Sequence, residues 1–165
     1  MNNPSDEKDR IKALNPEKSF MVVAPAGSGK TRLLVKRILV LLALVDNPEQ
    51  VLAITFTRKA AKEMSERVFE ILEIARGDIL NETTVDSELL VLAHPVVRRN
   101  EEKNWNIFDN QNRLRIQTID SFCRNITNQY ALETELSAVL EPVDNSEIMY
   151  SDASLALLKG IEESY

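Results

Sequence analysis

Eight consecutive residues, Ala24-Pro25-Ala26-Gly27-Ser28-Gly29-Lys30-Thr31, follow the pattern [A/G]-x-x-x-x-G-K-[S/T]. Gly27 and Gly29 allow the backbone to curl so that successive N–H groups point at one cluster of phosphates. A lysine in the next position reaches the β- and γ-phosphates of a nucleotide, and the Thr31 hydroxyl is a suitable ligand for Mg²⁺. The pattern therefore predicts a phosphate-binding loop.

A second segment, from Ile54 to Val68, is locally basic in a chain that is acidic overall. It carries four basic and two acidic side chains: Arg58, Lys59, Lys62, Arg67, Glu63 and Glu66. Cations at the start of a helix are unfavourable beside the positive end of its dipole, unless they meet an anion such as a DNA phosphate. Phe56 is able to stack on an unpaired base. The residues alone equally allow a core phenylalanine followed by a solvated basic turn.

A third segment runs from Gln117 to Arg124. Its hydroxyl groups, on Thr118 and Ser121, are able to donate hydrogen bonds to phosphate, and Phe122 is able to stack on a base. Taken alone, the segment favours a plainer interpretation, in which Asp120 caps a helix that carries a core phenylalanine.

Each of the three segments follows a stretch that is typical of a strand. Phe20–Ala24 and Val51–Phe56 are continuous apolar runs, as in buried parallel strands, and Leu114–Thr118 alternates. Helices are predicted after the first two, over Lys30–Val45 and from the N-cap Thr57 to about Ala75, with Gly77 just past the end. Ligands bind at the carboxyl edge of open α/β sheets, so the loop and the basic segment are expected at one edge.

Further helices are predicted around this framework. They span Ser5 to Leu14, Asp86 to His94 before Pro95, Asp120 to about Ala131, and Asp144 to the terminus at Tyr165. The rhythm of strand, turn and helix predicts an α/β domain with a parallel sheet. Three strands are few for this length, so the chain is expected to be part of a larger domain.

The composition excludes several classes of protein. The chain has 165 residues, a net charge of −6, 44% hydrophobic and 28% charged residues, one Cys and one His. A single Cys excludes an intrachain disulfide framework, and one Cys with one His cannot form a structural zinc site. The longest apolar run, Ile38–Val45, is far shorter than the about 20 residues that span a bilayer. A cytoplasmic protein without a membrane partner is predicted.

The three segments together resemble the start of superfamily 1 DNA helicases of the UvrD/Rep type. The residues that carry the resemblance are Ala24–Arg32, Thr55–Met64 and Thr118–Phe122, in matching order and separation. Within that group the chain is most similar to RecB/AddA-like helicase–nuclease subunits, the exonuclease V beta chains. The resemblance covers about residues 9 to 130.

The resemblance implies the first part of a RecA-like, P-loop NTPase motor domain, with a parallel sheet flanked by helices. Its implied divisions are an N-terminal helix region over 1–18, strand–loop–helix–strand–helix over 19–77, a helical insertion over 78–112, and a strand with C-terminal helices over 113–165. The implied ATP-binding residues are Ala26, Gly27, Ser28, Gly29, Lys30, Thr31 and Arg32, with Thr31 on Mg²⁺ and Arg32 against the adenine. The implied contacts to single-stranded DNA are Phe56, Thr57, Arg58, Thr118 and Ser121. Other helicase–nuclease subunits are further implied partners.

The chain departs from the family pattern at several points. Asp9 stands where the family usually has a Gln that contacts adenine, and Asp120 stands where it often has His. No Asp-Glu-x-x strand follows the third segment, and the arginine fingers and the second motor domain are missing. The 165 residues alone are therefore expected to be inactive. They are also expected to self-associate, because the apolar face of the helix over Leu33–Val45 would normally be covered by further strands and helices. Two alternatives are a small P-loop kinase or transferase and a non-catalytic remnant of a split helicase gene.

Overall fold

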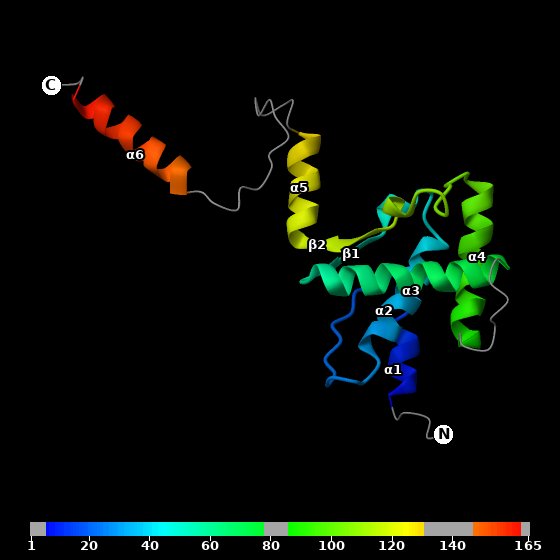
Figure 1. The fold of residues 1–165 in the computed structure, drawn as a ribbon. Coiled ribbons are helices and arrows are strands. Elements are labelled where there is room, and N and C mark those ends of the chain that lie inside the picture. The colour runs from blue at the N-terminus through cyan, green and yellow to red at the C-terminus, as the bar shows by residue number, and fades with distance from the viewer. Residues whose placement is uncertain (1–5, 78–85, 131–146, 163–165) are drawn as a thin grey trace. The chain divides into compact units, whose positions relative to one another are not determined.

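The computed structural model describes residues 6–77, 86–130 and 147–162 (Figure 1). The chain divides into two compact units, one ending at Cys123 and the other beginning at Arg124. The first unit contains α1 (Glu7–Lys12), α2 (Lys30–Leu42), β1 (Leu52–Thr55), α3 (Arg58–Arg76), α4 (Ser87–Glu102) and β2 (Arg115–Thr118), with short 3-10 turns at Pro48–Gln50 and Gln111–Arg113. Helix α5 (Ile119–Gln129) crosses the division, and α6 (Glu147–Glu162) belongs to the second unit.

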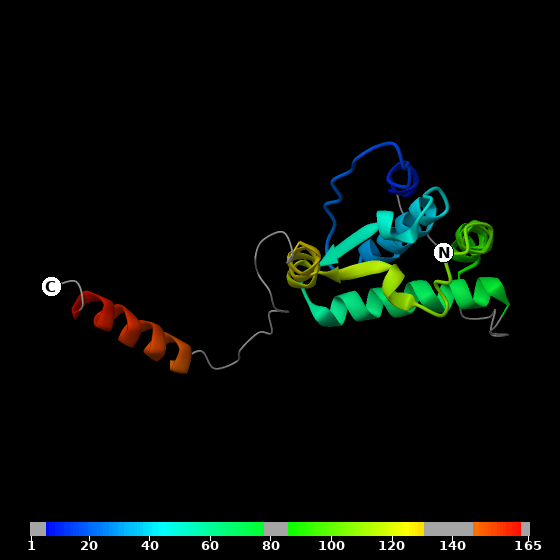
Figure 2. The same cartoon turned by 90° about the horizontal axis from the view of Figure 1, so that it is seen from above.

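Two parallel strands form the sheet. β1 pairs with β2 in a register that runs from Leu52 opposite Arg115 to Thr55 opposite Thr118. Helix α3 follows β1 and lies along both strands, as Figure 2 shows. Parallel strands require such a crossover connection, so the chain from 56 to 114 is the link that brings the two strands together. The predicted α/β class with a parallel sheet and flanking helices is confirmed at this level.

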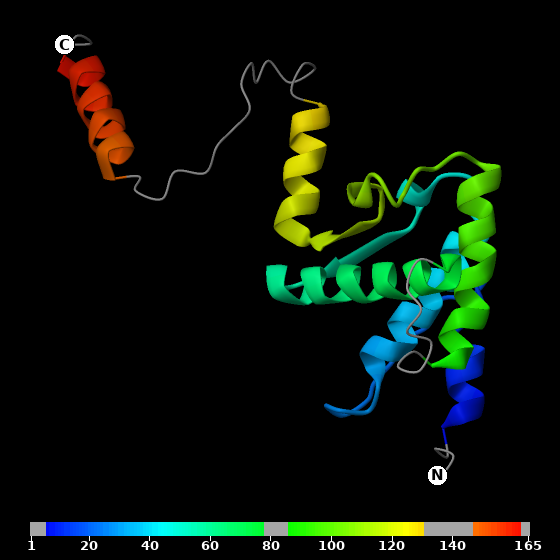
Figure 3. The same cartoon turned by 45° about the vertical axis from the view of Figure 1, so that its right-hand side comes forward.

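Helix α3 is the centre of the core. Its N-cap is Thr57, whose side chain accepts a hydrogen bond from the amide of Ala60 at 3.1 Å, and Gly77 ends it with a φ of 90°. Both predicted ends are therefore confirmed. One face of α3 packs against α2 and α4, which crosses it in Figure 3. The fully buried side chains of this core are Val35, Leu39, Val68, Leu72, Ala93, Val96 and Ile107.

The predicted strand at Phe20–Ala24 is wrong. This segment is extended but is not a strand, and Met21 and Val23 are 90% and 83% exposed. An apolar run becomes a buried strand only where other strands pair with its edges and helices cover its faces. In the described part of the chain the sheet has two strands, and neither pairs with this segment.

Helix α4 is longer than predicted, because it continues through Pro95 to Glu102. Proline in a helix interior removes one hydrogen bond and costs about 3 kcal/mol. Two nearby residues of the same helix, Ala93 and Val96, are completely buried in the core. The packing of these residues offsets the cost of the proline. A local sequence pattern does not reveal this packing.

The predicted cap of α5 is also different. Thr118 rather than Asp120 accepts the first amide hydrogen bond, from the N–H of Ser121 at 3.3 Å, and Asp120 lies within the first turn. Phe122 is half-buried and is not part of the core. The predicted continuation of this helix to Ala131 and the start of the last helix at Asp144 fall outside the described residues.

Candidate phosphate-binding loop and sheet edge

The loop from Pro25 to Gly29 turns sharply into α2. Gly27 and Gly29 have φ angles of 76° and 85°, in the left-handed region that favours glycine. The amide of Ser28 donates to the carbonyl of Pro25 at 3.4 Å, and Gly29 is the N-cap of α2. A Cβ added to Gly27 would meet no atom within 4 Å. The backbone conformation, rather than the lack of space, requires glycine at that position.

A cavity of about 510 Å³ lies beside the loop. Its lining residues are Ala26, Gly27, Gly29, Lys30, Thr31, Arg32 and Arg67. Three of them are cations, and no carboxylate from the described part of the chain lines the cavity. Arg67 comes from α3 and has no ion pair with a described residue. Sequence reasoning counted it only as part of a basic segment, because no local pattern shows that α3 passes the loop.

The side chain of Lys30 folds back onto the loop. Its ammonium donates hydrogen bonds to the carbonyl oxygens of Ala24 at 2.6 Å and of Pro25 at 2.5 Å. These two carbonyl oxygens stabilise the positive charge of the Lys30 ammonium. A phosphate that binds to Lys30 must therefore replace them or bind beside them.

Arg32 points to the start of α4. Its guanidinium forms ion pairs with Asp86 and, at 3.3 Å, with Glu88, and Lys36 also pairs with Glu88. These cations lower the pKa of the Glu88 carboxyl, mainly through the hydrogen bond from Lys36. The structure thus places Arg32 at the cavity and gives it carboxylate partners that the sequence did not reveal.

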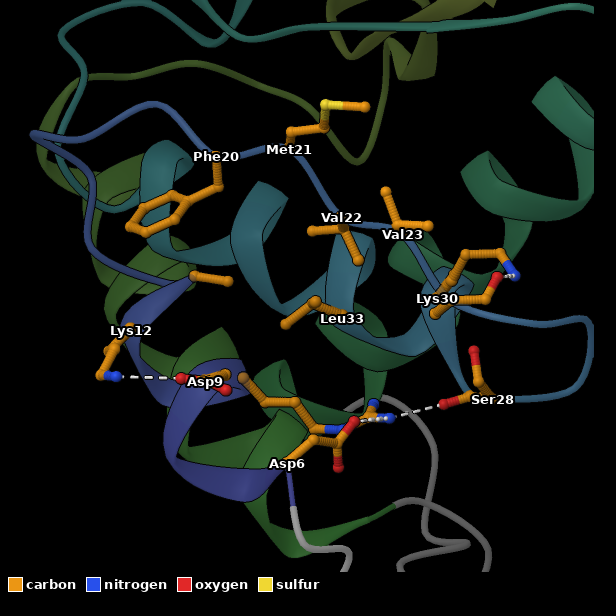
Figure 4. Close-up of a pocket in the computed structure, with 13 residues that line it drawn as sticks. Asp6, Asp9, Lys12, Phe20, Met21, Val22, Val23, Ser28, Lys30 and Leu33 are labelled. Atoms are coloured by element: carbon orange, nitrogen blue, oxygen red, sulfur yellow. Dashed lines mark hydrogen bonds and ion pairs between the residues drawn. The ribbon is translucent and has the colours of Figure 1, made fainter.

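A second cavity, of about 420 Å³, lies on the α1 side of the loop (Figure 4). Figure 4 shows Phe20 to Val23 along one side of it and Asp6 and Asp9 along the other. The carboxylate of Asp9 accepts a hydrogen bond from Lys12 at 2.9 Å. Asp9 therefore lines a cavity near the loop, although its charge is already paired within α1.

The carboxyl ends of the two strands meet at one edge, where Thr55 lies opposite Thr118. Phe56 follows β1 and is 92% exposed, so the alternative of a core phenylalanine is wrong. Thr57 and Arg58 are exposed as well, and Arg58 has no ion pair with a described residue. Phe56, Thr57 and Arg58 therefore form a free surface.

The third predicted segment is less accessible. Thr118 is 3% exposed, and its hydroxyl lies 3.0 Å from the hydroxyl of Ser121. The pair adjoins the Phe56 surface because β1 and β2 end together. Of these two residues, only the half-buried Ser121 offers its side chain to a ligand without a change in the backbone.

The fold and this site define a mixed α/β domain with a small parallel sheet, a glycine loop that opens a helix, and a free surface at the sheet edge. The model of the UvrD/REP helicase N-terminal domain matches residues 5–164. The chain belongs to this family. The predicted UvrD/Rep affiliation is confirmed, whereas a closer relation to RecB/AddA-like subunits stays a prediction.

Curated relatives agree with this assignment. The chain is 34% identical to DNA helicase II of Salmonella typhimurium over 117 residues, which are 67% of this chain and 16% of that protein. It is 40% identical to the ATP-dependent DNA helicase PcrA of Bacillus subtilis over 98 residues, 59% of this chain and 13% of that protein. The chain thus spans only a small part of the length of these relatives. No solved structure matched with statistical significance.

Two kinds of feature are absent from the described residues. None of the helices is long and apolar enough to cross a membrane. In the same described ranges, no group of three His, Cys, Asp or Glu side chains is arranged to hold a metal ion.

Proposed function

We propose that this chain is the nucleotide-binding and DNA-contacting first part of an ATP-dependent DNA helicase that acts in repair and recombination. The observation that carries the proposal is the cavity beside the loop, which Lys30, Arg32 and Arg67 line without a described carboxylate. Such a concentration of positive charge beside glycine amides and a helix start suits the phosphates of ATP.

The loop residues have distinct roles in this proposal. The amides from Ala26 to Thr31 donate to the phosphate oxygens, and the N-terminus of α2 adds the positive end of its dipole. Lys30 leaves the carbonyls of Ala24 and Pro25 to bind the β- and γ-phosphates. Arg32, which lines the same cavity, lies against the adenine.

The residues fit Mg²⁺ only in part. The hydroxyl of Thr31 provides one oxygen ligand, and the nucleotide phosphates provide others, but Mg²⁺ sites in NTPases also use a carboxylate. The described residues contain no cluster of such ligands. We therefore propose that these 165 residues alone bind MgATP without turning it over, since the lack of an arginine finger alone lowers turnover by a factor of about 10³–10⁵.

Single-stranded DNA is the proposed second ligand. Phe56 is 92% exposed and is free to stack on a base, and Thr57 and Arg58 lie beside it for phosphate contacts. Thr118 and Ser121 end the neighbouring strand and extend this surface, with Ser121 as the accessible donor. Stacking and phosphate contacts do not read sequence, so binding is expected to be independent of base order.

Calorimetric titration of the full chain with MgATP tests the proposal. Lys30→Ala removes one charge-assisted contact of about 1.5–3 kcal/mol, so the Kd is expected to rise roughly ten- to a hundredfold. Lys62→Ala is the matched control, because Lys62 pairs only with Glu66 on the outside of α3, at 3.7 Å. Equal ATP affinity in the wild type and Lys30→Ala would contradict the assignment of the loop.

A second candidate is the helicase subunit of a helicase–nuclease complex. Its basis is the resemblance of the three segments to RecB/AddA-like chains, which stays a prediction. A nuclease assay on the full-length parent protein, with its partner subunits, separates this candidate from a helicase without nuclease activity. Of the other two alternatives, a small P-loop kinase would require an acceptor substrate and would show no stimulation of its ATPase by single-stranded DNA. A non-catalytic remnant of a split helicase gene would show no ATPase activity at all.

A further inference from the structure

Arg10 of α1 contacts the loop on the side of the 420 Å³ cavity. Its Nη2 atom donates a hydrogen bond to the carbonyl oxygen of Ser28 at 2.7 Å. A Cβ added to Gly29 would lie 3.4 Å from Nη1 of the same guanidinium, so the group also lies close to the next residue of the loop. Ser28 lines the cavity on this side, whereas Gly27 and Gly29 line the basic cavity.

The contact fixes the direction of one peptide group. The Ser28–Gly29 peptide is trans, as are the other peptide bonds of the described residues, and in a trans peptide the C=O and the following N–H point in opposite directions. Because Arg10 holds the carbonyl of Ser28 on its own side, the amide of Gly29 points away from Arg10. Gly29 lines the basic cavity, so its N–H is directed to the place where a phosphate would bind.

We propose that Arg10 is a positioning residue, which fixes the Ser28–Gly29 peptide so that the Gly29 amide donates to a nucleotide phosphate. The inference rests on the proposed function, because it assigns a role within the same ATP site. It makes α1, a helix that the sequence did not connect to the loop, part of the phosphate-binding apparatus.

The surroundings of Arg10 hold its guanidinium in place. Asp6 forms an ion pair with Nη2 at 2.8 Å, and the side chain of Arg10 is only 29% exposed. This hydrogen bond from Arg10 lowers the pKa of Asp6. A guanidinium with one fixed carboxylate and one carbonyl partner has little freedom to leave the loop, so the peptide keeps its direction before a nucleotide binds.

A purely structural role is the competing explanation. In that case Arg10 would only attach α1 to the domain. Its loss would lower the stability of the protein, and any loss of affinity would be the same for AMP, ADP and ATP. A positioning role instead predicts a loss of affinity that increases from AMP to ADP to ATP, and a change at the Gly29 amide. The two explanations therefore differ in what they predict for ligands and for one backbone group.

The test uses the full chain with selective ¹⁵N-glycine labelling, which is simple because the chain has four glycines. Arg10→Ala is expected to shift the Gly29 amide resonance without nucleotide. It is also expected to raise the Kd for MgATP about tenfold and that for AMP about twofold or less. Arg10→Lys keeps a hydrogen-bond donor and should retain most of the affinity for MgATP. Arg10→Gln replaces Arg10→Ala in the test if the alanine variant does not fold.

Lys12→Ala is the matched control, since it removes an α1 ion pair, with Asp9, that does not touch the loop. An unchanged Gly29 resonance together with unchanged MgATP affinity in Arg10→Ala would overturn the inference. The inference would also be overturned if Arg10→Ala lost affinity for AMP and ATP equally and if Lys12→Ala showed the same loss. A wild-type chain that binds no ATP would refute the proposed function, whereas the glycine spectrum of the free chain still tests the orientation of the peptide.

Discussion

Arg113 holds both carboxylate oxygens of Glu49. Its Nε atom lies 2.5 Å from Oε1 and its Nη2 atom 3.1 Å from Oε2, although the two residues are 64 positions apart in the sequence. A third donor of the same guanidinium binds the carbonyl of Trp105. The pair joins the turn before β1 to the turn before β2, and so it fixes the starts of the two strands relative to each other.

This pair predicts a pH dependence of stability. The hydrogen bond from Arg113 lowers the pKa of Glu49 below its ordinary value of about 4.3. A lowered pKa in the folded state means that the stabilisation is complete above the unfolded pKa and is lost as the pH falls through the folded pKa. The free energies of unfolding of wild type and Glu49→Gln, measured with urea, should therefore differ at pH 7, and the difference should begin to shrink as the pH falls below about 4.3. A constant difference across that range would contradict the prediction.

The N-cap of α3 predicts a stability change at the candidate DNA surface. Thr57→Ala removes the acceptor for the Ala60 amide and should lower the free energy of unfolding by about 1 kcal/mol. Thr57→Ser keeps the hydroxyl and should remain close to the wild type. Thermal melts followed by circular dichroism provide the measurement, and equal losses in both variants would exclude capping as the cause.

The contact between α4 and Arg32 predicts a tighter nucleotide complex in Glu88→Gln. The substitution removes a carboxylate 3.3 Å from a cation that lines the basic cavity. The site is exposed and screened by solvent, so we expect only an about two- to threefold decrease in the Kd for MgATP at low salt. Glu102→Gln, at the other end of α4, is the control. Weaker binding in Glu88→Gln would mean that the carboxylates position Arg32 for the nucleotide instead of competing with it.

The exposed start of α3 predicts a change in the salt dependence of DNA binding. Arg58→Ala should weaken the binding of oligo-dT and reduce the slope of log K against log salt by about 0.7 or less, the value for one phosphate of a single strand. Fluorescence anisotropy at several salt concentrations measures it. Lys59 is a poor control because it adjoins Arg58 in the sequence. Lys103→Ala is the preferred control, because Lys103 pairs with Asp46 at 2.8 Å and lies outside this surface. An unchanged slope would leave Arg58 as a solvated residue.

The unpaired apolar segment predicts self-association of the chain. Met21 and Val23 are 90% and 83% exposed, and such clustered apolar surface favours contacts between copies. Sedimentation velocity should show association that increases with concentration and that the double substitution Met21→Lys, Val23→Lys reduces. Val91→Lys removes a single exposed valine from α4 and should have no such effect. Association that is equal in all three proteins would assign it to another surface.

Local chemistry made parts of the site predictable. The left-handed angles of Gly27 and Gly29, the cap at Thr57 and the end of α3 at Gly77 each depend on a few neighbouring residues, and all were recognisable. The parallel sheet, though not the direct pairing of β1 with β2, was recognisable from the strand patterns and from the helix that follows β1.

Contacts between distant segments were not predictable. Arg10 with Ser28, Arg32 with Asp86 and the approach of Arg67 to the loop join segments whose spacing follows no period. The segment at Phe20–Ala24 has the pattern of a strand, but pairing depends on neighbours that a local pattern does not describe. The same limit applies to Pro95, because only burial of the flanking residues keeps α4 continuous there.

Trp105 is the single tryptophan of the chain, 1% exposed, with its indole N–H donating to the carbonyl of Asp46 at 2.7 Å. Asp46 follows the C-terminal end of α2, and the 13 residues of that helix place about 20 Å between this end and the candidate phosphate-binding loop. The chain thus contains an intrinsic fluorophore far from the proposed nucleotide site. Its emission should follow the loosening of the α2–α4 junction while remaining unchanged by ATP, so unfolding and ligand binding can be observed separately in one sample.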